Sequence, residues 1–599
     1  MTTEETDHAE RLETLNKNIA RIEELSQRLV TALSQKKSVN PGLRGPSQDL
    51  YVKAATAYVA EMMSNPSKIL EHQIGYWGKA LKHYVDAQQN LAQGKLAPPD
   101  DAGPTDRRFS NPLWDEHPYF NFIKQQYLFS SEAISSAVAD LDNLDETDKK
   151  RVRYFTQQIV DMLSPTNFLG TNPEALARAA ETDGQSLIDG LENLVRDIEA
   201  SDGELLVSLA DKDAFRVGEN IGATEGSVVY RNEILELIQY APTTKQVHAT
   251  PLLIFPPWIN KFYILDPKPK NSLIKWIVDQ GHTLFVVSWK NPDATYRDFG
   301  MGAYVEKGYL AAIEQVKEIT GEEKINTVGY CIAGTTLSLT LALMEKRGDE
   351  SIKSATFFTT LTDFEDQGEV GVFLSNDFVD SIEEEVNEAG VLESFIMSRT
   401  FSYLRSNDLI YSPAIKSYMM GQKPPAFDLL FWNGDGTNLP ARMSMEYLRG
   451  LCQENRFARD GFEVLGESVR IGDVKVPICA VACEADHIAA WKTSFAGFQK
   501  MGSKSKTFIL SESGHIAGIV NPPSKMKYGH YTNSDWSGNA DDWRKEAEYH
   551  EGSWWPRWGR WLKTRSGKQV DARIPGSEKS HPALAPAPGF YVTEKPETC

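Results

Sequence analysis

The spacing of hydrophobic residues changes at about residue 210. From about 8 to 37, apolar residues recur every three or four positions with charged residues between them: Leu12, Leu15, Ile19, Ile22, Leu29 and Leu33. This spacing predicts an amphipathic helix or a short coiled coil, which either packs on its own domain or binds a partner or a surface. From about 110 to 205 the pattern is again mostly helical. We therefore interpret 1–40 as an amphipathic N-terminal helix and 41–210 as a mainly helical domain.

After about 210, short apolar runs alternate with helical segments. Helices are predicted at 303–319 and 333–346, and the apolar runs span 251–255, 283–288, 325–328, 354–358, 476–481 and 507–510. Strands that alternate with helices indicate a mostly parallel sheet covered on both faces. Residues from about 363 to 472 interrupt this alternation. We interpret them as a cap inserted over the C-terminal edge of the sheet, within a catalytic domain that spans 211–599.

Composition and charge narrow the possible partners and the location. Lys and Arg total 63 against 83 Asp and Glu, so the formal net charge is −20, which argues against a nucleic-acid partner. Five cysteines in 599 residues do not suggest a disulfide framework. The acidic N-terminus lacks the apolar run of a signal peptide, and no stretch reaches the roughly 18 apolar residues of a transmembrane helix. The expected location is the reducing cytoplasm.

The sharpest chemical signal is a cysteine between a short strand and a helix. The sequence Gly329-Tyr-Cys331-Ile-Ala-Gly334 follows the layout of a nucleophile elbow, with cysteine in the place of serine. The turn would present the thiol at a helix N-terminus, where the dipole favours the thiolate. Ala333 stands where a glycine is usual, and alanine is poor at positive φ, which weakens the motif. A buried structural cysteine in a strand–helix turn is the alternative interpretation.

A nucleophile elbow predicts an acid and then a histidine, each just after a later strand. Asp486 follows the strand at 476–481, and His515 follows the strand at 507–510, in the required order. In this arrangement His515 takes the proton from Cys331, and Asp486 orients and stabilises the imidazolium. The backbone N–H of Ile332 would form half of the oxyanion hole, and the loop 255–260 would supply the other half.

Other residues near these strands offer competing assignments. Asp363 follows an earlier strand and is an alternative acid, whereas Glu484 is expected to cap its turn. His487 adjoins the acid and is expected to line the pocket. Cys479 and Cys483 lack further Cys or His at metal spacing, so they are interpreted as core residues, and no metal or bound cofactor is predicted. The predicted fold is an α/β-hydrolase fold with an inserted cap and a helical N-terminal domain.

A cysteine nucleophile favours thioester chemistry. Exchange of one thioester for another is nearly balanced in free energy, whereas a serine ester formed early would be a poorer acyl donor. The elbow therefore favours acyl transfer, although cysteine hydrolases also occur on this fold.

Several further segments, in order, resemble those of the class I polyhydroxyalkanoate synthases. The resemblance extends from about 106 to 592 and is carried by Asp106-Arg-Arg-Phe-Ser-Asn-Pro-Leu-Trp114, Ser164-Pro-Thr-Asn167, Thr224-Glu-Gly-Ser-Val-Val-Tyr-Arg-Asn232, Pro256-Pro-Trp-Ile-Asn-Lys261, Tyr263-Ile-Leu-Asp266, Ser288-Trp-Lys-Asn-Pro292, Phe427-Asp-Leu-Leu-Phe-Trp-Asn433, Thr437-Asn-Leu-Pro440, Gly514-His-Ile-Ala-Gly518, Asn521-Pro-Pro523, Ser553-Trp-Trp555, Trp558 and Trp561. In that family the elbow usually reads Gly-x-Cys-x-Gly-Gly, and Ala333 departs from it.

The resemblance implies polymerisation of (R)-3-hydroxyacyl-CoA into a polyester, with favoured short monomers such as 3-hydroxybutyryl. Cys331 would be acylated while CoA departs as a leaving group, and the next 3-hydroxyl would attack through His515. The resemblance also implies a homodimer formed through the catalytic domain, a location on cytoplasmic polyester granules, and an N-terminal domain that contributes to granule and protein association. A cysteine thioesterase of the same fold and a non-catalytic granule-surface scaffold are the competing functions.

Overall fold

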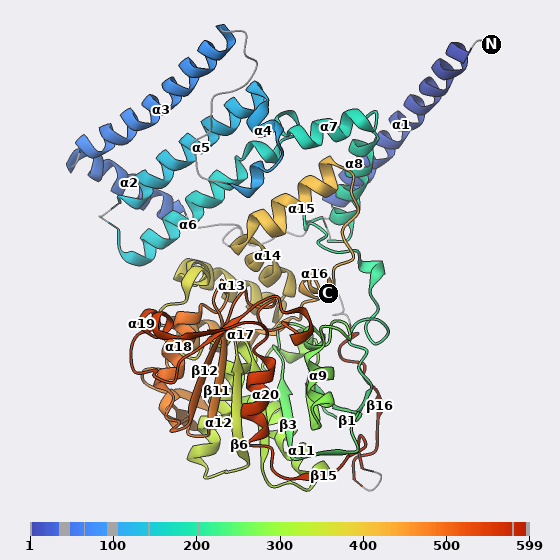
Figure 1. Cartoon of the computed structure of the whole chain (residues 1–599), viewed down its shortest axis with the longest axis vertical. Coiled ribbons are helices and arrows are strands. Elements are labelled where there is room, and N and C mark those ends of the chain that lie inside the picture. The colour runs from blue at the N-terminus through green and yellow to red at the C-terminus, as the bar shows by residue number, and fades with distance from the viewer. Residues whose placement is uncertain are drawn as a thin grey trace. The chain divides into compact units, whose positions relative to one another are not determined.

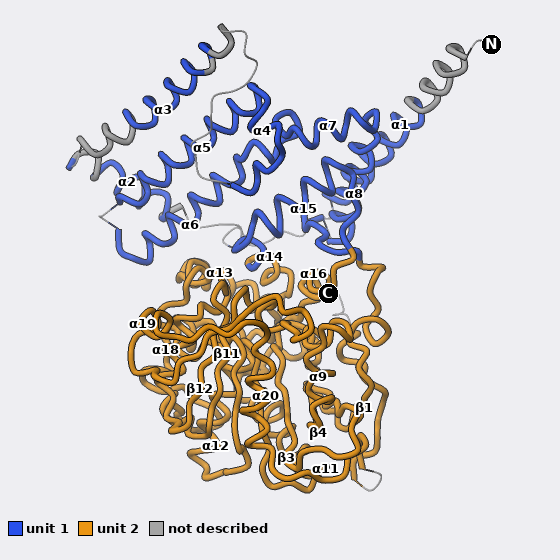
Figure 2. Tube along the Cα trace, viewed as in Figure 1, with its two compact units in different colours: residues 1–211, 401–425 blue, residues 212–400, 426–599 orange. Residues whose placement is uncertain are grey.

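A computed structural model describes residues 3–34, 43, 48–64, 66–92, 106–141, 144–201, 203–577 and 580–594. The chain forms two compact units, shown in separate colours in Figure 2. The helical unit comprises 1–211 and 401–425, and the α/β unit comprises 212–400 and 426–599. No helix among these described ranges combines the length and hydropathy needed to cross a membrane.

The helical unit is built largely from helices of the N-terminal region. Their bounds are α1 Thr3–Ser34, α2 Gln48–Ser64, α3 Pro66–Ala92, α4 Leu113–Glu116, α5 Pro118–Ala139, α6 Glu146–Met162, α7 Pro173–Glu181 and α8 Gln185–Glu199. α1 packs along α8 through the fully buried Leu25, which lies in one cluster with Ile188 and Val195. Ion pairs flank this seam, including Arg28 with Glu199 at 2.7 Å. One face of α1 therefore packs within its own unit.

Two residues of the predicted amphipathic pattern of α1 are Leu12 and Leu15. Their side chains are not among those that the structure describes. Farther along, Ile19 and Leu33 are each 47% exposed. The helix thus buries Leu25 against α8 while it leaves other apolar positions open to solvent. Both interpretations of this helix, internal packing and surface binding, remain compatible with that division of its faces.

Residues 401–425 pack with the N-terminal helices, which corrects the placement of the whole 363–472 insertion in the catalytic domain. This segment includes the end of α14 (Ser394–Leu404), the short α15 (Ser412–Ala414) and two π-helical turns, Asn407–Tyr411 and Ile415–Met419. The side chain of Asn193 on α8 donates to the carbonyls of Ser417 and Gln422, both at 3.2 Å. Such contacts join residues more than 200 positions apart, so local sequence patterns carry no signal for them.

The α/β unit contains a sheet of twelve strands in the order β14-β13-β12-β11-β6-β5-β3-β4-β2-β1-β16, with β15 paired to β3 (Figure 1). Six central strands are parallel: β4 (His282–Trp289), β3 (Gln246–Phe255), β5 (Ile325–Tyr330), β6 (Ile352–Phe358), β11 (Ile478–Cys483) and β12 (Lys506–Ser511). These are the six strands predicted from the apolar runs. The prediction of a mostly parallel α/β sheet is therefore confirmed.

Six further strands extend the sheet, and sequence reasoning missed them. They are β1 (Gly226–Arg231), β2 (Leu235–Tyr240), β13 (His530–Thr532), β14 (Glu548–His550), β15 (Gln569–Asp571) and β16 (Ala585–Pro586), and all of them pair antiparallel. The last four strands have only two or three residues each, too few to establish a period of two.

Helices cover both faces of the parallel strands. On one face, α9 (Leu273–Asp279) meets α20 (Trp555–Lys563), with the rings of Trp276 and Trp555 centred 5.6 Å apart. On the other, α12 (Ile332–Lys346) packs on β5 and β3, and α11 (Ala311–Thr320) follows α10 (Met301–Ala303) and the π-helical turn Tyr304–Leu310. Near the later strands of the sheet, α18 (Trp491–Lys500) contacts β11.

The segment between β6 and β11 supplies the remaining elements of the α/β unit. Within it lie α13 (Asn376–Ala389), α16 (Asp428–Asn433), α17 (Ala441–Met445), the π-helical turn Glu446–Gln453, and the strand pairs β7 (Val391–Leu392) with β8 (Leu439–Pro440) and β9 (Phe462–Val464) with β10 (Glu467–Val469). Later in the chain, α19 (Ala540–Glu546) precedes β14. This segment interrupts the strand–helix alternation at the position where the cap was predicted.

The contact between α8 and 401–425 depends on a glycine. A Cβ on Gly190 would lie 2.0 Å from the carbonyl oxygen of Tyr418, so Gly190→Ala is expected to displace that segment. Limited trypsin digestion should then cut faster at Lys416, which Ser417 follows. Gly170→Ala is the matched control, because nothing lies within 4 Å of its added Cβ. Equal digestion of the two variants would contradict the packing described for 401–425.

Candidate active site

Cys331 occupies a strained turn between β5 and α12. Its φ of 55° and ψ of −128° lie outside the regions that non-glycine residues ordinarily adopt. The turn is tight because strand and helix approach closely: a Cβ on Gly329 would lie 2.5 Å from the Cα of Gly334. A Cβ on Gly334 would lie 2.1 Å from Thr360 Oγ1. The two glycines of the predicted elbow are therefore required by the packing.

Hydrogen bonds from the neighbouring strand hold this strained residue. The N–H of Cys331 donates to the carbonyl of Phe358 at 2.8 Å, and the hydroxyl of Thr360 donates to the carbonyl of Cys331 at 3.2 Å. Ala333 lies in the first turn of α12 without positive φ, so the weakness expected from its replacing glycine does not arise. The strain falls on Cys331 itself, whose side chain is partly exposed.

Asp486 and His515 meet beyond the ends of β11 and β12. The Nδ1 of His515 and the Oδ2 of Asp486 are 2.7 Å apart, and the Asp486 side chain is fully buried. The other carboxylate oxygen accepts the N–H groups of Ile488 and Ala489, both at 2.8 Å. Asp486 is therefore fixed in orientation and has one oxygen left for the imidazole.

His515 interacts with both predicted partners. Burial lowers the pKa of His515, but the charges of Asp486 and Cys331 and side-chain hydrogen bonds to both residues outweigh burial and raise that pKa well above its usual value. Because Nδ1 is taken by Asp486, Nε2 is the ring nitrogen left for the Cys331 thiol. The structure thus brings Cys331, His515 and Asp486 together, with His515 between the other two residues.

The loop that carries His515 is anchored by aromatic residues. The ring of Tyr330 stacks on the His515 ring with centroids 5.8 Å apart, and its hydroxyl donates to the His515 carbonyl at 3.3 Å. The indole N–H groups of Trp554 and Trp555 donate to the carbonyls of Gly518 and Ile519 at 2.7 and 2.9 Å. These supports explain the position of the imidazole, which the strand pattern alone does not specify.

Backbone donors of the predicted oxyanion hole are available. Ile332 is the first residue of α12, so its N–H has no intrahelical acceptor, and it bonds to no other residue that the structure describes. In the loop after β3, Pro256 and Pro257 lack N–H groups, so the first backbone donors are those of Trp258 and Ile259. Neither of these two forms a hydrogen bond within the described ranges.

The competing residues have other partners. Asp363 contacts Lys500 at 2.5 Å and Asn455 at 2.7 Å, and Glu484 accepts the Arg544 Nε–H at 2.8 Å. Cys479 and Cys483 are fully buried in the sheet core, and burial raises the pKa of each thiol. Within the described chain, no group of three or more possible metal ligands occurs.

Tyr447, on the π-helical turn Glu446–Gln453, is a residue near the thiol that sequence reasoning missed. Burial raises its pKa well above the usual value, with smaller contributions from the charges of Cys452 and Cys331 and a hydrogen bond to Cys452. Its ring meets the Trp258 ring edge-on, with centroids 5.8 Å apart. Tyr447 comes from the irregular insertion, where neither periodicity nor a motif marked it.

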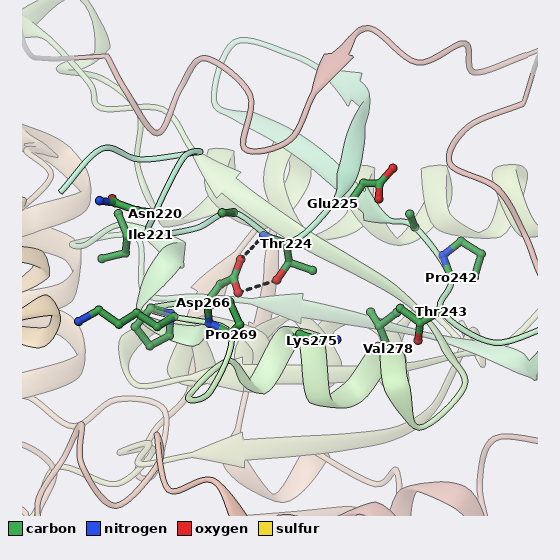
Figure 3. A pocket seen from close by; sticks show the side chains of 14 residues that line it. Asn220, Ile221, Thr224, Glu225, Pro242, Thr243, Asp266, Pro269, Lys275 and Val278 are labelled. Carbon is green, nitrogen blue, oxygen red and sulfur yellow. Dashed lines mark hydrogen bonds between the residues drawn. The ribbon is translucent and has the colours of Figure 1, made fainter. Parts of the chain in front are cut away.

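A separate pocket of about 310 Å³ lies in the α/β unit, and no triad residue lines it (Figure 3). Its buried acid, Asp266, accepts the Thr224 N–H at 2.9 Å and the Thr224 hydroxyl at 2.7 Å, the two bonds drawn in Figure 3. Thr224 and Asp266 belong to segments that carried the family resemblance. Because the Asp266 carboxylate is satisfied by its own chain, the pair is a structural tie.

Comparison with known proteins identifies the family. A profile for the N-terminus of poly-beta-hydroxybutyrate polymerase (PhaC) matches residues 105–277, and one for the alpha/beta hydrolase fold matches 259–522. The poly(3-hydroxyalkanoate) polymerase of Methylorubrum extorquens is 41% identical, covering 92% of this chain and 91% of that protein. The polymerase subunits PhaC of Rhizobium etli and Cupriavidus necator are each 38% identical, covering 97% and 88% of this chain and 92% and 90% of those proteins.

A solved thioesterase domain from the curacin biosynthetic pathway aligns with 49% of this chain and 95% of that domain, with 9% identity and a TM-score of 0.29. The fold class rests on the strand order and the matching profile. Together they define a protein of the α/β-hydrolase fold. The chain belongs to the poly(3-hydroxyalkanoate) polymerase family, and it is an acyltransferase-type enzyme of polyester synthesis. The resemblance drawn from the sequence motifs is thereby confirmed.

Replacement of Asp486 by Asn should lower the pKa of His515, because burial would then dominate. A raised folded-state pKa stabilises the fold below the usual pKa, and that contribution is lost as pH rises through the raised value. In Asp486→Asn, where burial leaves the folded-state pKa of His515 below its usual value, this stabilising contribution should be absent. Alkylation of Cys331 by iodoacetamide at neutral pH, followed by mass spectrometry, should slow by about tenfold.

Asp363→Asn is the control for this prediction, since Asp363 is a buried acid that contacts Lys500 and Asn455. Its alkylation profile should match that of the unaltered protein. An unchanged profile in Asp486→Asn, or an equal change in both variants, would contradict the role of Asp486 in setting the state of His515.

Proposed function

We propose that this enzyme polymerises (R)-3-hydroxyacyl-CoA, in particular 3-hydroxybutyryl-CoA, through a thioester on Cys331. The observation that carries this proposal is the contact of one imidazole with both a buried carboxylate and a strained cysteine thiol. Family membership supports the polyester product, and the cysteine favours a thioester donor. CoA leaves with the substrate and is not a resident cofactor.

In the first step of the proposed mechanism, the Cys331 thiolate attacks the carbonyl carbon of the acyl-CoA. The negative charge that develops on the carbonyl oxygen is stabilised by the N–H of Ile332 and a donor of the loop after β3. Collapse of this intermediate breaks the carbon–sulfur bond to CoA. His515 gives its proton to the departing thiolate, so the products are free CoA and an acyl-Cys331 thioester.

In the second step, a 3-hydroxyl group attacks the acyl-Cys331 thioester. His515, now neutral, takes the hydroxyl proton, and Asp486 stabilises the resulting imidazolium. The new bond is an ester, and Cys331 departs as the thiolate. The elongated chain carries the CoA thioester of the added monomer, so it reacylates Cys331 and releases that CoA. One thiol is sufficient for this cycle.

The function is tested with purified protein and (R)-3-hydroxybutyryl-CoA. We expect CoA release, followed with a thiol reagent, together with an insoluble polyester identified by its size. Cys331→Ala should abolish both, because the acyl group then has no covalent acceptor. Cys479→Ala is the control: this thiol is buried in the sheet core, so its loss should leave CoA release intact.

Two outcomes would overturn the proposal. Release of CoA with only free 3-hydroxybutyrate would mean that water is the acceptor and that the enzyme acts as a thioesterase. Polymer formation by Cys331→Ala would exclude Cys331 as the nucleophile. Loss of activity in Cys479→Ala as well would indicate general unfolding, which circular dichroism of each variant separates from loss of the thiol.

We propose that the helical unit also associates with polyester granules, through the exposed apolar face of α3. Trp77 is 67% exposed, and Ile74 and Leu81 are each 63% exposed. Tyr84 and Val85 continue this face along the helix. Solvent exposure of several large apolar side chains at helical spacing is unfavourable in water and typical of a binding surface. The proposed product is itself apolar, and it remains attached to the same chain through Cys331.

Leu81→Asp should weaken binding to preformed poly(3-hydroxybutyrate) particles in a cosedimentation assay. Burial of one leucine contributes about 2 kcal/mol, which corresponds to a loss of roughly thirtyfold in affinity. Both proteins would carry Cys331→Ala, which prevents covalent attachment to polymer. Lys82→Gln changes the charge by the same amount at an exposed position about 100° around α3 from Leu81 and should bind normally. Equal binding by the two variants would contradict the proposed surface.

Family resemblance further supports a homodimer formed through the α/β unit and association with other granule proteins, and we include both in the proposal. Sedimentation of the full chain with and without (R)-3-hydroxybutyryl-CoA measures the first. Affinity for purified granules stripped of their proteins, compared with native granules, measures the second.

A further inference from the structure

A buried hydrogen bond joins the loop after β3 to the helix that follows the nucleophile. The indole Nε1–H of Trp258 donates to Thr336 Oγ1 at 3.2 Å. Trp258 is 1% exposed, and Thr336 is fully buried. A bond between two side chains 78 residues apart, both shielded from water, fixes the two backbone segments relative to each other.

Each end of this bond belongs to one half of the predicted oxyanion hole. Trp258 and Ile259 carry the first backbone N–H groups of the loop, and Ile332 begins α12. Thr336 lies one helical turn after Ile332, and its Oγ1 is 3.4 Å from the Ile332 carbonyl oxygen. The bond therefore links Trp258, in the loop with the first two backbone N–H donors, to the first turns of α12, which carry the N–H of Ile332.

The ring of Trp258 is held as well as its N–H. Tyr304 lies 6.0 Å away and Tyr447 lies 5.8 Å away, measured between ring centroids. These two aromatic residues come from the segment before α11 and from the insertion after β6. Because two rings pack against the indole, rotation of Trp258 away from Thr336 would disturb these contacts.

We propose that Trp258 is a positioning residue of the polymerase, which holds the two halves of the oxyanion hole at a fixed separation through Thr336. The inference rests on the proposed function, because it takes Cys331 as the nucleophile. Backbone donors stabilise a developing oxyanion only when they lie at hydrogen-bond distance from its final position. Without the tie, the loop after β3 has no described side-chain hydrogen bond to the first turns of α12.

The proposal predicts a selective loss of acyl transfer. Trp258→Phe keeps an aromatic ring without the N–H, and Thr336→Val keeps the shape without the hydroxyl. Each should slow acylation of Cys331 by (R)-3-hydroxybutyryl-CoA by roughly tenfold in a single turnover, less than the roughly hundredfold or more lost when an oxyanion donor is removed outright. The double variant should be no slower than either single variant, because both remove one bond.

Alkylation of Cys331 by iodoacetamide supplies the readout that separates positioning from general damage. Alkylation uses the thiolate but forms no oxyanion, so its rate should be unchanged in all three variants. A parallel fall in alkylation and acylation would overturn the proposal, since it would mean that the nucleophile itself is disturbed. Additive effects of the two substitutions would also overturn it.

The chain offers a matched control pair. Trp558 Nε1–H donates to Thr356 Oγ1 at 3.0 Å, and both residues are buried between α20 and β6. Trp558→Phe and Thr356→Val remove the same kind of bond, yet the acylation rate should stay within twofold of the unaltered protein. If acylation in these control variants slowed as much as in Trp258→Phe, the effect of Trp258→Phe would be explained by lost stability. That result would overturn the inference.

The inference and the proposed function fail differently. If Cys331→Ala still releases CoA, the proposed nucleophile is wrong, whatever Trp258 does. If Cys331→Ala is inactive while Trp258→Phe and Thr336→Val acylate at the normal rate, the nucleophile stands and only the positioning role of Trp258 is overturned.

Discussion

The close approach of β5 and α12 is the constraint on which the site depends. Gly329 and Gly334 leave no room for a side chain between strand and helix, and the chain turns through Cys331 at a φ of 55°. A non-glycine residue in such a conformation costs on the order of 1–3 kcal/mol, which surrounding contacts must offset. The bonds from Cys331 to Phe358 and Thr360 contribute to that offset. This turn places Cys331 directly after the C-terminal end of β5.

Electrostatics then couples the thiol to residues of two later strands. Burial alone would keep His515 neutral, and it is the buried carboxylate of Asp486 together with Cys331 that reverses this preference. Asp486 does not need a cationic partner of its own, because two backbone N–H groups satisfy its other oxygen. His515 is thereby held between the carboxylate of Asp486 and the side chain of Cys331.

The parts of this architecture that follow local rules were predictable from the sequence. The six parallel strands are continuous apolar runs, and the elbow requires small residues at fixed positions, so Cys331, Asp486 and His515 could be selected by their order after strands. Short antiparallel strands such as β13 and β14 are not predictable in this way. Nor are contacts across long sequence separations, such as Asn193 with Ser417 or Trp258 with Thr336. The sequence around each of these residues does not differ from that around other buried or capping residues, so it does not indicate the distant partner.

The chemistry explains why such long-range contacts matter in this enzyme. Exchange between two thioesters is nearly balanced in free energy, so the direction of acyl transfer is set by the later ester-forming step. In the proposed mechanism, the thiolate of Cys331 supplies the nucleophile, but it does not stabilise the negative charge that develops on the carbonyl oxygen. Stabilisation of the oxyanion requires donors from two separate segments, β3 and α12, held at one distance. On the proposed mechanism, the bond from Trp258 to Thr336 would therefore affect every round of elongation, although neither side chain contacts a reacting atom.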